Sequence, residues 1–171
     1  MEKKIEEDKE NKNIEIKLSK IELNITEILT EISKQNEEVE YNPDDPFAYP
    51  SRSEVTLKTY FERINRYSNI QQSTLIIILI YVDRICITSG IILNPHNIHR
   101  LILGCLILAI KYNEDIYFNN EYYAKVGGVS LKELNTLEEI SFELIDYNLF
   151  VSDDIYQKYL DYITNYKDEK S

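Results

Sequence analysis

Several residue types are scarce in this chain of 171 residues. It has no tryptophan, one methionine, four glycines and four prolines. Glycine and proline supply most of the turns of strand-rich folds, so their scarcity argues against a turn-rich β fold and favours long elements. The two cysteines, Cys86 and Cys105, lie within apolar runs. That placement favours free thiols in a reducing compartment over a disulfide framework.

The chain also has no apolar run long enough to span a membrane. The main ones, at 75–82 and 101–110, are much shorter than the roughly 20 residues that a membrane-spanning helix needs. The first residues are charged, unlike the apolar stretch of a signal peptide. We therefore expect no membrane partner and an intracellular location, in the nucleus and/or the cytoplasm.

The chain has no excess of basic residues, because its net charge is -11. Residues 1–50 contain 14 acidic and 7 basic residues, whereas residues 51–151 contain 11 and 9. The acidity therefore belongs mainly to the N-terminal arm. A nucleic-acid-binding domain would be expected to carry a basic stripe, so we expect no nucleic-acid partner.

Helical periodicity is what the arm does contain. Its apolar residues recur at spacings of three and four: Ile14, Leu18, Ile21, Ile25, Ile28 and Ile32. This pattern predicts an acidic flexible tail over 1–12 and an amphipathic helix over 13–36. The apolar stripe needs a cover, which is either the chain's own domain or a partner or second copy; self-association through 13–36 therefore stays open. Prolines in the next segment predict a linker over 37–50.

Three helices are predicted directly after the linker. The motif Ser51-Arg52-Ser53-Glu54 has the spacing of a capping box and predicts the start of the first. The second spans about 72–89 and is apolar nearly all round, which is typical of a helix at the centre of a bundle. Asn94-Pro95 predicts the start of the third, over about 95–113.

Three shorter helices are predicted in the rest of the chain. One spans about 119–126 and stops at Gly127-Gly128. Ser130 and Glu133 form a second capping-box pattern for a helix over about 130–146, and the last helix spans about 153–166. Together the helices predict an all-α fold.

Two charged residues interrupt these apolar patterns. Lys111 and Glu138 have no nucleophile, metal cage or phosphate loop near them in the sequence. A charge that a domain does not use for itself is often kept for a partner. A salt bridge within the domain is the other interpretation.

Five motifs together indicate a family: Tyr81-Val82-Asp83-Arg84, Asn97-Ile98-His99-Arg100, Ala109-Ile110-Lys111-Tyr112, Tyr122-Tyr123-Ala124-Lys125-Val126-Gly127-Gly128 and Glu133-Leu134-Asn135. They resemble the cyclin box, and specifically that of P/U-type cyclins related to the fungal phosphate-pathway cyclin. The resemblance implies a single five-helix cyclin-box domain at 51–151, with the arm helix added before it and a C-terminal helix and tail at 152–171. The Met-Arg-Ala-Ile-Leu motif of mitotic cyclins is missing, as it is in P/U-type cyclins.

The resemblance implies a regulatory subunit, not an enzyme, that binds and activates a cyclin-dependent serine/threonine kinase. It implies that Lys111 and Glu138 are the paired polar contacts to a mobile kinase helix. The apolar contacts around them would be Tyr112, Phe142, Tyr147 and Leu149. Two alternatives stay open: a cyclin-fold adaptor that assembles through its N-terminal helix without activating a kinase, and a nucleic-acid-binding cyclin-like domain.

The remaining candidate residues point to structural roles. Asp83 follows eight apolar residues, so it needs a partner, and Arg63 is the predicted one. The resemblance makes His99 a packing or capping residue, and Gly127-Gly128 is expected to end a helix. His96 and His99 have no further ligand residues nearby, so we expect no metal and no cofactor.

Overall fold

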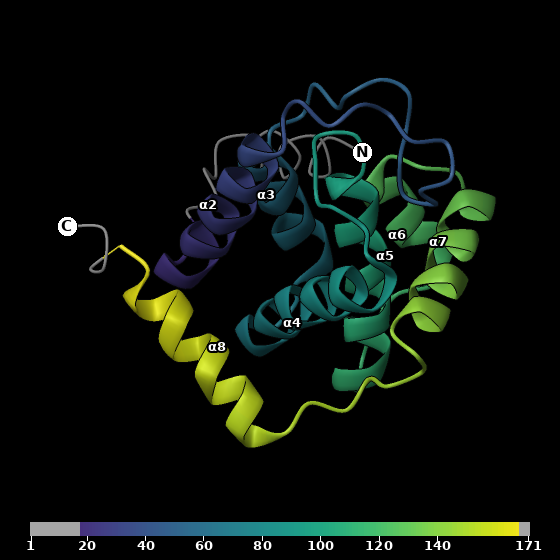
Figure 1. Ribbon diagram of the computed structural model, residues 1–171. Helices are drawn as coiled ribbons and strands as arrows, with labels where there is room; N and C mark the ends of the chain where they lie inside the picture. Colours follow the sequence, from purple (N-terminus) through teal and green to yellow (C-terminus); the bar gives the residue numbers. More distant parts are fainter. Residues whose placement is uncertain (1–17, 168–171) are drawn as a thin grey trace, which may run out of the picture.

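The computed structural model describes residues 18–167, which form seven α-helices and no β-strand within that range (Figure 1). The helices are α2 (Lys20–Gln35), α3 (Leu57–Ser68), α4 (Gln72–Ser89), α5 (Ile98–Asn113), α6 (Asn120–Gly127), α7 (Leu131–Leu144) and α8 (Asp153–Asn165). The all-α prediction is confirmed. The predicted acidic tail, the first residues of the predicted arm helix (13–17) and residues 168–171 lie outside the described residues.

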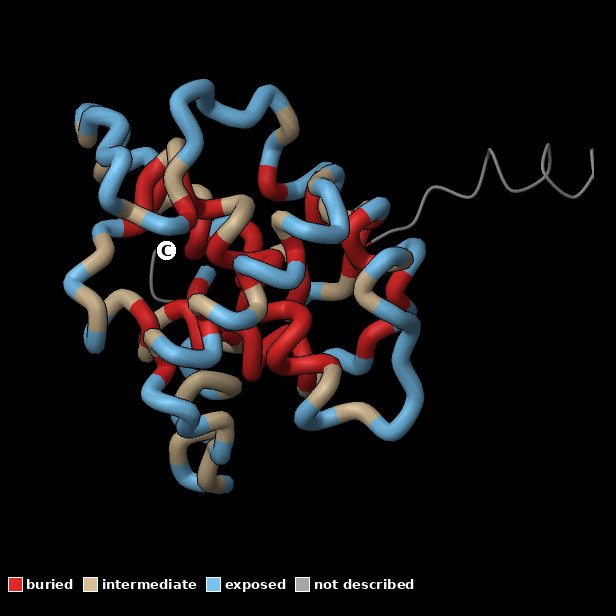
Figure 2. The backbone as a smooth tube through the Cα atoms, turned by 90° about the vertical axis from the view of Figure 1, so that its right-hand side faces the viewer, coloured by how far each residue is buried: buried red, intermediate tan, exposed pale blue. Residues whose placement is uncertain are grey.

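Helices α4 and α5 form the core. All of residues 74–82 and 101–110 are buried, and Figure 2 shows this buried backbone at the centre of the molecule. Among the described helices, α4 alone is long and apolar enough to cross a membrane by length and composition. Core helices share that property, and α4 packs here against α2, α5, α7 and α8.

The packing of α5 against α7 is unusually close at one point. A Cβ atom built on Gly104 of α5 would lie 2.1 Å from Ser141 Oγ and 3.2 Å from the Leu137 carbonyl oxygen of α7. Only glycine fits at this position without a shift of α7. The contact therefore sets how near the two helices come.

Helix α2 packs against the chain's own surface. Its N-terminus is closed by a capping box, in which the Ser19 hydroxyl accepts from the Glu22 amide and the Glu22 carboxylate accepts from the Ser19 amide. Ile25 and Ile28 are buried, and the helix contacts α3, α4 and α8. In the described part of the arm, the apolar stripe is therefore covered by the chain's own domain, which is one of the two predicted covers. Self-association through residues 13–36 stays a prediction.

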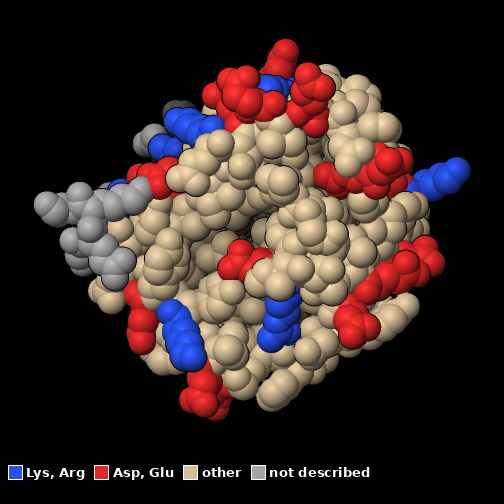
Figure 3. Space-filling model, in the orientation of Figure 1, with Lys and Arg blue, Asp and Glu red and all other residues tan. Residues whose placement is uncertain are grey.

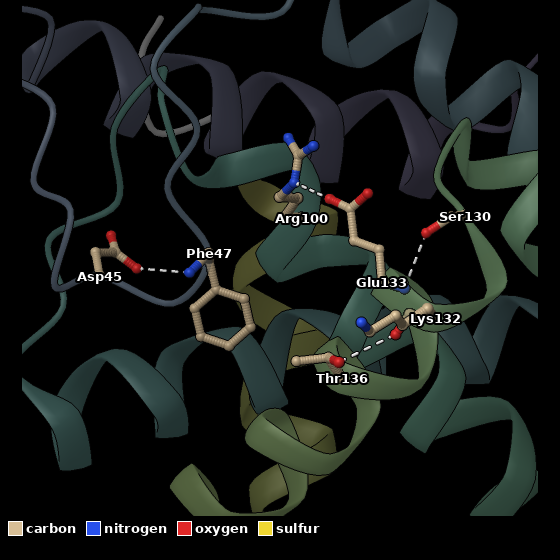
Figure 4. Close-up of polar contacts among 7 residues, drawn as sticks. All are labelled: Asp45, Phe47, Arg100, Ser130, Lys132, Glu133 and Thr136. Atoms are coloured by element: carbon tan, nitrogen blue, oxygen red, sulfur yellow. Dashed lines mark hydrogen bonds and ion pairs between the residues drawn. The ribbon is translucent and has the colours of Figure 1, made fainter.

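The linker contains no helix, as predicted, but α3 begins later than predicted. Ser53 Oγ accepts from the Val55 amide in a turn, and Thr56 caps α3 by accepting from the Thr59 amide at 3.2 Å. The predicted start at Ser51 is therefore wrong. Ser and Thr form turns and caps with the same hydroxyl group, so the capping-box spacing at Ser51–Glu54 could not distinguish a helix start from a turn. Phe47, fully buried, anchors the linker to the domain (Figure 4).

One other predicted helix start and one predicted capping box need correction. Helix α5 begins at Ile98, because Asn94-Pro95 lies in a turn in which the Asn94 carboxamide accepts from a backbone amide two residues later. Ser130 does cap α7, accepting from the Glu133 amide at 3.1 Å. The reciprocal capping-box bond is not made, because the Glu133 carboxylate pairs with Arg100 of α5 at 2.6 Å (Figure 4).

The predicted helix stop at two glycines depends on one of them. Gly128 has a φ of 72°, and its amide donates to the Ala124 carbonyl at the end of α6. Gly127 is still helical. A Cβ there would lie 2.5 Å from Leu103, so its requirement is close packing on α5.

The predicted pairing of Asp83 with Arg63 is wrong. The Asp83 carboxylate accepts from the Tyr159 hydroxyl of α8 at 2.8 Å, and the Arg63 guanidinium lies 5.4 Å from the centre of the Tyr60 ring. A hydroxyl can hydrogen-bond a half-buried carboxylate without bringing a second charge out of water. The sequence of α3 and α4 cannot indicate that α8 supplies this group.

His99 joins α5 to the end of the linker. Its Nε2 donates to the Val55 carbonyl at 2.7 Å, and its ring meets Tyr60 edge to face with 5.1 Å between the ring centres. Burial lowers the pKa of His99, and the nearby Arg63 and Arg100 lower it further. The imidazole is therefore kept neutral.

Substitution of Gly104 by alanine is expected to destabilise the fold by about 1–3 kcal/mol, because overpacking outweighs the roughly 1 kcal/mol gain in helix propensity. Ser141→Ala removes the atom that the new methyl group meets first, and Ser141 Oγ is buried without a hydrogen-bond partner. G104A should therefore cost less in an S141A background. Urea unfolding of the four proteins in a double-mutant cycle measures the coupling, and strict additivity would contradict the contact.

Stability is expected to fall as the pH drops below about 6.5, the ordinary histidine pKa. The unfolded chain then binds a proton at His99 that the folded chain, with its lowered pKa, does not, so protonation favours unfolding. His99→Gln keeps a donor for the Val55 carbonyl and cannot titrate. Its free energy of unfolding should depend less steeply on pH than that of the wild type between pH 7.5 and 5.5, and equal slopes would refute this role.

Candidate functional site

Lys111 and Glu138 meet between α5 and α7. The Lys111 Nζ donates to Glu138 Oε1 at 2.6 Å, and the two side chains are 33% and 23% exposed. Lys111 lies near the end of α5 and Glu138 in the middle of α7, the two helices that meet closely at Gly104. The internal salt bridge that the sequence left open is therefore formed.

A third residue holds the glutamate from its other side. Asn120, at the start of α6, donates to Glu138 Oε2 at 2.7 Å and to Asn135 Oδ1 at 2.8 Å. Sequence reasoning missed both asparagines. The only signal was the pair Asn119-Asn120 at the start of a helix, where a cap is the usual explanation. With both oxygens bonded, the carboxylate has a fixed orientation.

A groove of about 370 Å³ adjoins this pair. It is lined by Leu108, Lys111, Tyr112, Asn135, Glu138, Glu139, Phe142 and Leu149. Five of the six predicted contact residues are among them. The sixth, Tyr147, packs edge to face against Phe142 with 4.8 Å between the ring centres.

Large aromatic side chains are exposed around the groove. The exposed fractions are 52% for Tyr112, 36% for Phe142 and 61% for Tyr147, and Phe150, which sequence reasoning missed, is 64% exposed. Clustered exposed aromatic groups are typical of surfaces that bind another protein. The groove thus combines one fixed ion pair with an apolar rim.

The turn after α7 is held in a strained conformation by α4. Asp146 and Tyr147 both have a φ of 55°, which is uncommon for residues other than glycine. The Tyr81 hydroxyl donates to the Leu149 carbonyl at 2.6 Å, and Arg84 Nη1 donates to the carbonyls of Asn148 and Phe150 at 3.1 and 2.8 Å. Burial raises the pKa of Tyr81 to about 12, so its hydroxyl stays a donor.

These groups can bind but show little chemical reactivity. Burial raises the pKa of Cys86 to about 11 and that of Cys105 well above the ordinary thiol value, so neither thiol is a ready nucleophile. Among the described residues, no cluster of three His, Cys, Asp or Glu side chains is arranged to hold a metal ion. The groove is suited to receive an element of another protein.

A second groove, of about 350 Å³, lies beside the N-terminus of α7. Arg100 and Lys132 line it, but the Arg100 side chain is paired with Glu133 (Figure 4). The guanidinium also lies 4.3 Å from the centre of the Tyr49 ring. Its guanidinium is therefore used to hold the linker and α7 together. We regard this groove as structural.

Comparison with known proteins identifies a family and several relatives of this chain. The family model for Cyclin matches residues 4–149. The chain is 36% identical over 114 residues to Cyclin-U4-1 of Arabidopsis thaliana (66% of this chain, 56% of the relative) and 40% identical over 112 residues to Cyclin-U3-1 of the same plant (64% and 51%). It is 32% identical over 146 residues to PHO85 cyclin-7 of Saccharomyces cerevisiae (78% and 51%).

The chain spans about half the length of these curated relatives. The family match covers most of the chain and includes α5, α6 and α7, which build the groove. The U-type and PHO85 relatives agree with the motifs of the P/U subtype. The chain therefore belongs to the cyclin family, as a P/U-type cyclin.

Proposed function

We propose that this cyclin binds and activates a cyclin-dependent serine/threonine kinase through the groove beside Lys111 and Glu138. The observation that supports the proposal best is the fixed, half-buried ion pair with exposed aromatic side chains around it. The names of two relatives refer to PHO85, namely PHO85 cyclin-7 of Saccharomyces cerevisiae and PHO85 cyclin-like protein psl1 of Schizosaccharomyces pombe, which fits a kinase partner for this chain. The intracellular location expected from the sequence stays part of this proposal.

Activation follows from what a protein kinase needs. Its active site requires an ion pair between a lysine and a glutamate on a mobile helix, so a partner that holds that helix in place turns the kinase on. Phe142, Tyr112 and Leu149 supply an apolar surface for the helix to bury. The ion pair supplies register, because polar contacts fix position more than they add affinity.

The salt bridge does not use up the polar groups. A lysine ammonium has three donors, and one is bonded to Glu138. Each glutamate oxygen accepts one bond and has a further lone pair. Both residues can therefore bond the backbone of a kinase helix while they remain paired with each other.

The alternatives have weaker support. An adaptor that assembles through its N-terminal helix needs an exposed apolar stripe, and the described part of that stripe is packed on α3, α4 and α8. A nucleic-acid-binding role needs a basic surface, which the near-neutral charge of residues 51–151 does not favour.

A kinase assay tests the function directly. The purified chain is added to a panel of purified cyclin-dependent kinases, including the yeast PHO85 kinase, and binding and phosphorylation of a peptide substrate are measured. We expect binding and a rise in activity with at least one kinase. Binding without activation would favour the adaptor, and binding to none of the panel would contradict the proposal.

Charge reversal of the ion pair is expected to weaken kinase binding. Lys111→Glu and Glu138→Lys should each cost about 2–5 kcal/mol of binding, as for other desolvated interfacial charges. Both single variants also lose the internal salt bridge. The double variant K111E/E138K restores an internal pair with the charges exchanged, so it should recover thermal stability and still fail to bind. Calorimetric titration and thermal unfolding together measure both effects.

The double variant separates the two roles of the pair. If K111E/E138K is stable and binds the kinase as the wild type does, the pair is only structural and the assignment fails. Lys132→Glu is a suitable control, because Lys132 is exposed on α7 and lines the other groove. That substitution should leave binding unchanged within about 0.5 kcal/mol.

Arg84→Ala is expected to weaken kinase binding although Arg84 does not line the groove. The turn that carries Tyr147 and Leu149 would lose two hydrogen bonds, and ordering it again on binding should cost about 1–2 kcal/mol. Hydrogen exchange at the Tyr147 and Asn148 amides should also speed up. Lys58→Ala is the control, because it removes one positive charge from the exposed face of α3 without affecting the turn. Normal binding by R84A together with faster exchange would show that the turn's order is not needed.

A further inference from the structure

A separate pocket lies between α2, α4 and α8. It encloses about 360 Å³ and is lined by Ile28, Ile32, Leu79, Asp83, Lys158, Tyr159 and Tyr162. None of these residues lines the groove beside Lys111 and Glu138. In Figure 1, α2 and α8 lie on the side of the molecule opposite α7. Figure 3, in the same view, shows a hollow with an acidic group in it and basic side chains at its edge.

One carboxylate, that of Asp83, lies in the wall of this pocket without an ion-pair partner among the described residues, although Lys158 also lines the pocket. Asp83 Oδ2 accepts from the Tyr159 hydroxyl at 2.8 Å. Within residues 18–167, Asp83 Oδ1 has no hydrogen-bond partner and no lysine or arginine forms an ion pair with Asp83. Burial raises the pKa of Asp83, which reflects the loss of water around a charge that has little compensation. A cation in the pocket would supply that compensation.

The other walls suit an aliphatic chain that carries the cation. Ile28 and Ile32 of α2 and Leu79 of α4 are apolar, and they can cover methylene groups. Tyr162 is half exposed at the pocket, and aromatic faces attract cations as well as apolar stems. The complementary ligand therefore has a flexible apolar stem and a positively charged end.

The geometry favours lysine over arginine. The Tyr159 hydroxyl already bonds Oδ2, which keeps one further lone pair, whereas both lone pairs of Oδ1 are open. A ligand that needs Oδ1 alone therefore does not share an oxygen with Tyr159. A guanidinium binds a carboxylate best through two parallel hydrogen bonds to both oxygens, whereas an ammonium is a point charge that needs one.

We propose that the pocket between α2, α4 and α8 binds a lysine side chain of a partner polypeptide, at a docking site distinct from the kinase groove. The charge complementarity of Asp83 and the apolar walls select this occupant. The proposal does not depend on the kinase groove, because the two sites share no residue. It would give this cyclin a second point of contact for a bound protein.

The test uses the full chain, labelled with ¹⁵N, and three capped tripeptides. Ac-Leu-Lys-Leu-NH₂ is the probe, the same peptide with norleucine has the stem without the charge, and the same peptide with arginine has the other cation. We expect the lysine peptide to bind about tenfold more tightly than the norleucine peptide, with amide shifts in α2, α4 and α8. The arginine peptide should bind more weakly than the lysine peptide.

Two variants and one control decide the outcome. Asp83→Asn keeps an acceptor for Tyr159 and should abolish the preference for lysine, and Tyr162→Ala should weaken binding several-fold. Asp161→Asn removes an exposed carboxylate of the same helix, one bonded to Gln157, and should change nothing. The proposal is overturned if D83N still prefers lysine, if the norleucine or arginine peptide binds as tightly, or if the shifts map to α5 and α7. The amide spectrum of each variant checks that it is folded.

Discussion

The close contact between Gly104 and Ser141 is the constraint on which the rest of the site depends. It lets α5 and α7 approach at a distance that no other residue at position 104 allows without a shift. Glu138 lies about one turn from Ser141, and Lys111 about two turns from Gly104, so their separation follows from that approach. Asn120 then fixes the glutamate from α6. Gly104 thus sets the geometry of the Lys111–Glu138 pair, although Gly104 itself is not part of the kinase contact that we propose.

The ion pair that stabilises the free chain would also favour the complex that we propose, for one physical reason. A lysine side chain loses about 1.5–2 kcal/mol of conformational entropy when it is immobilised. Here Lys111 is already bonded and half buried before any partner arrives, so much of that cost is met during folding. An internal salt bridge and a partner contact were opposed interpretations of the sequence. In the folded chain the internal salt bridge is formed, and it would prepare both residues for the partner contact that we propose.

Much of the fold could be predicted from the sequence, because long apolar patterns decide it. The all-round apolar character of α4 indicated the core, and the serine before α7 indicated its cap. The helix starts near Ser51 and Asn94 were wrong because serine and asparagine form turns as readily as caps. Asp83 bonds Tyr159, and Asp146 and Tyr147 have positive φ, for reasons that lie in distant segments or in tertiary strain. The local sequence pattern carries no information about the Asp83–Tyr159 bond or about these backbone angles. The family resemblance, in contrast, indicated the residues that line the groove.

The two helices outside the five-helix unit change what the unit's surface offers. Helices α2 and α8 meet over α4 and bury its apolar flank, with Asn24 of α2 donating to the Ile163 carbonyl of α8. This packing leaves Asp83 in the pocket wall with the Tyr159 hydroxyl as its one hydrogen-bond partner among the described residues. An uncharged asparagine would have been less costly to bury there. Stability alone gives no reason for a charge at that point. The kinase groove that we propose is built from the box alone, whereas the proposed Asp83 pocket combines α4 of the box with the flanking helices α2 and α8. We therefore expect selectivity among partners to depend more on the pocket.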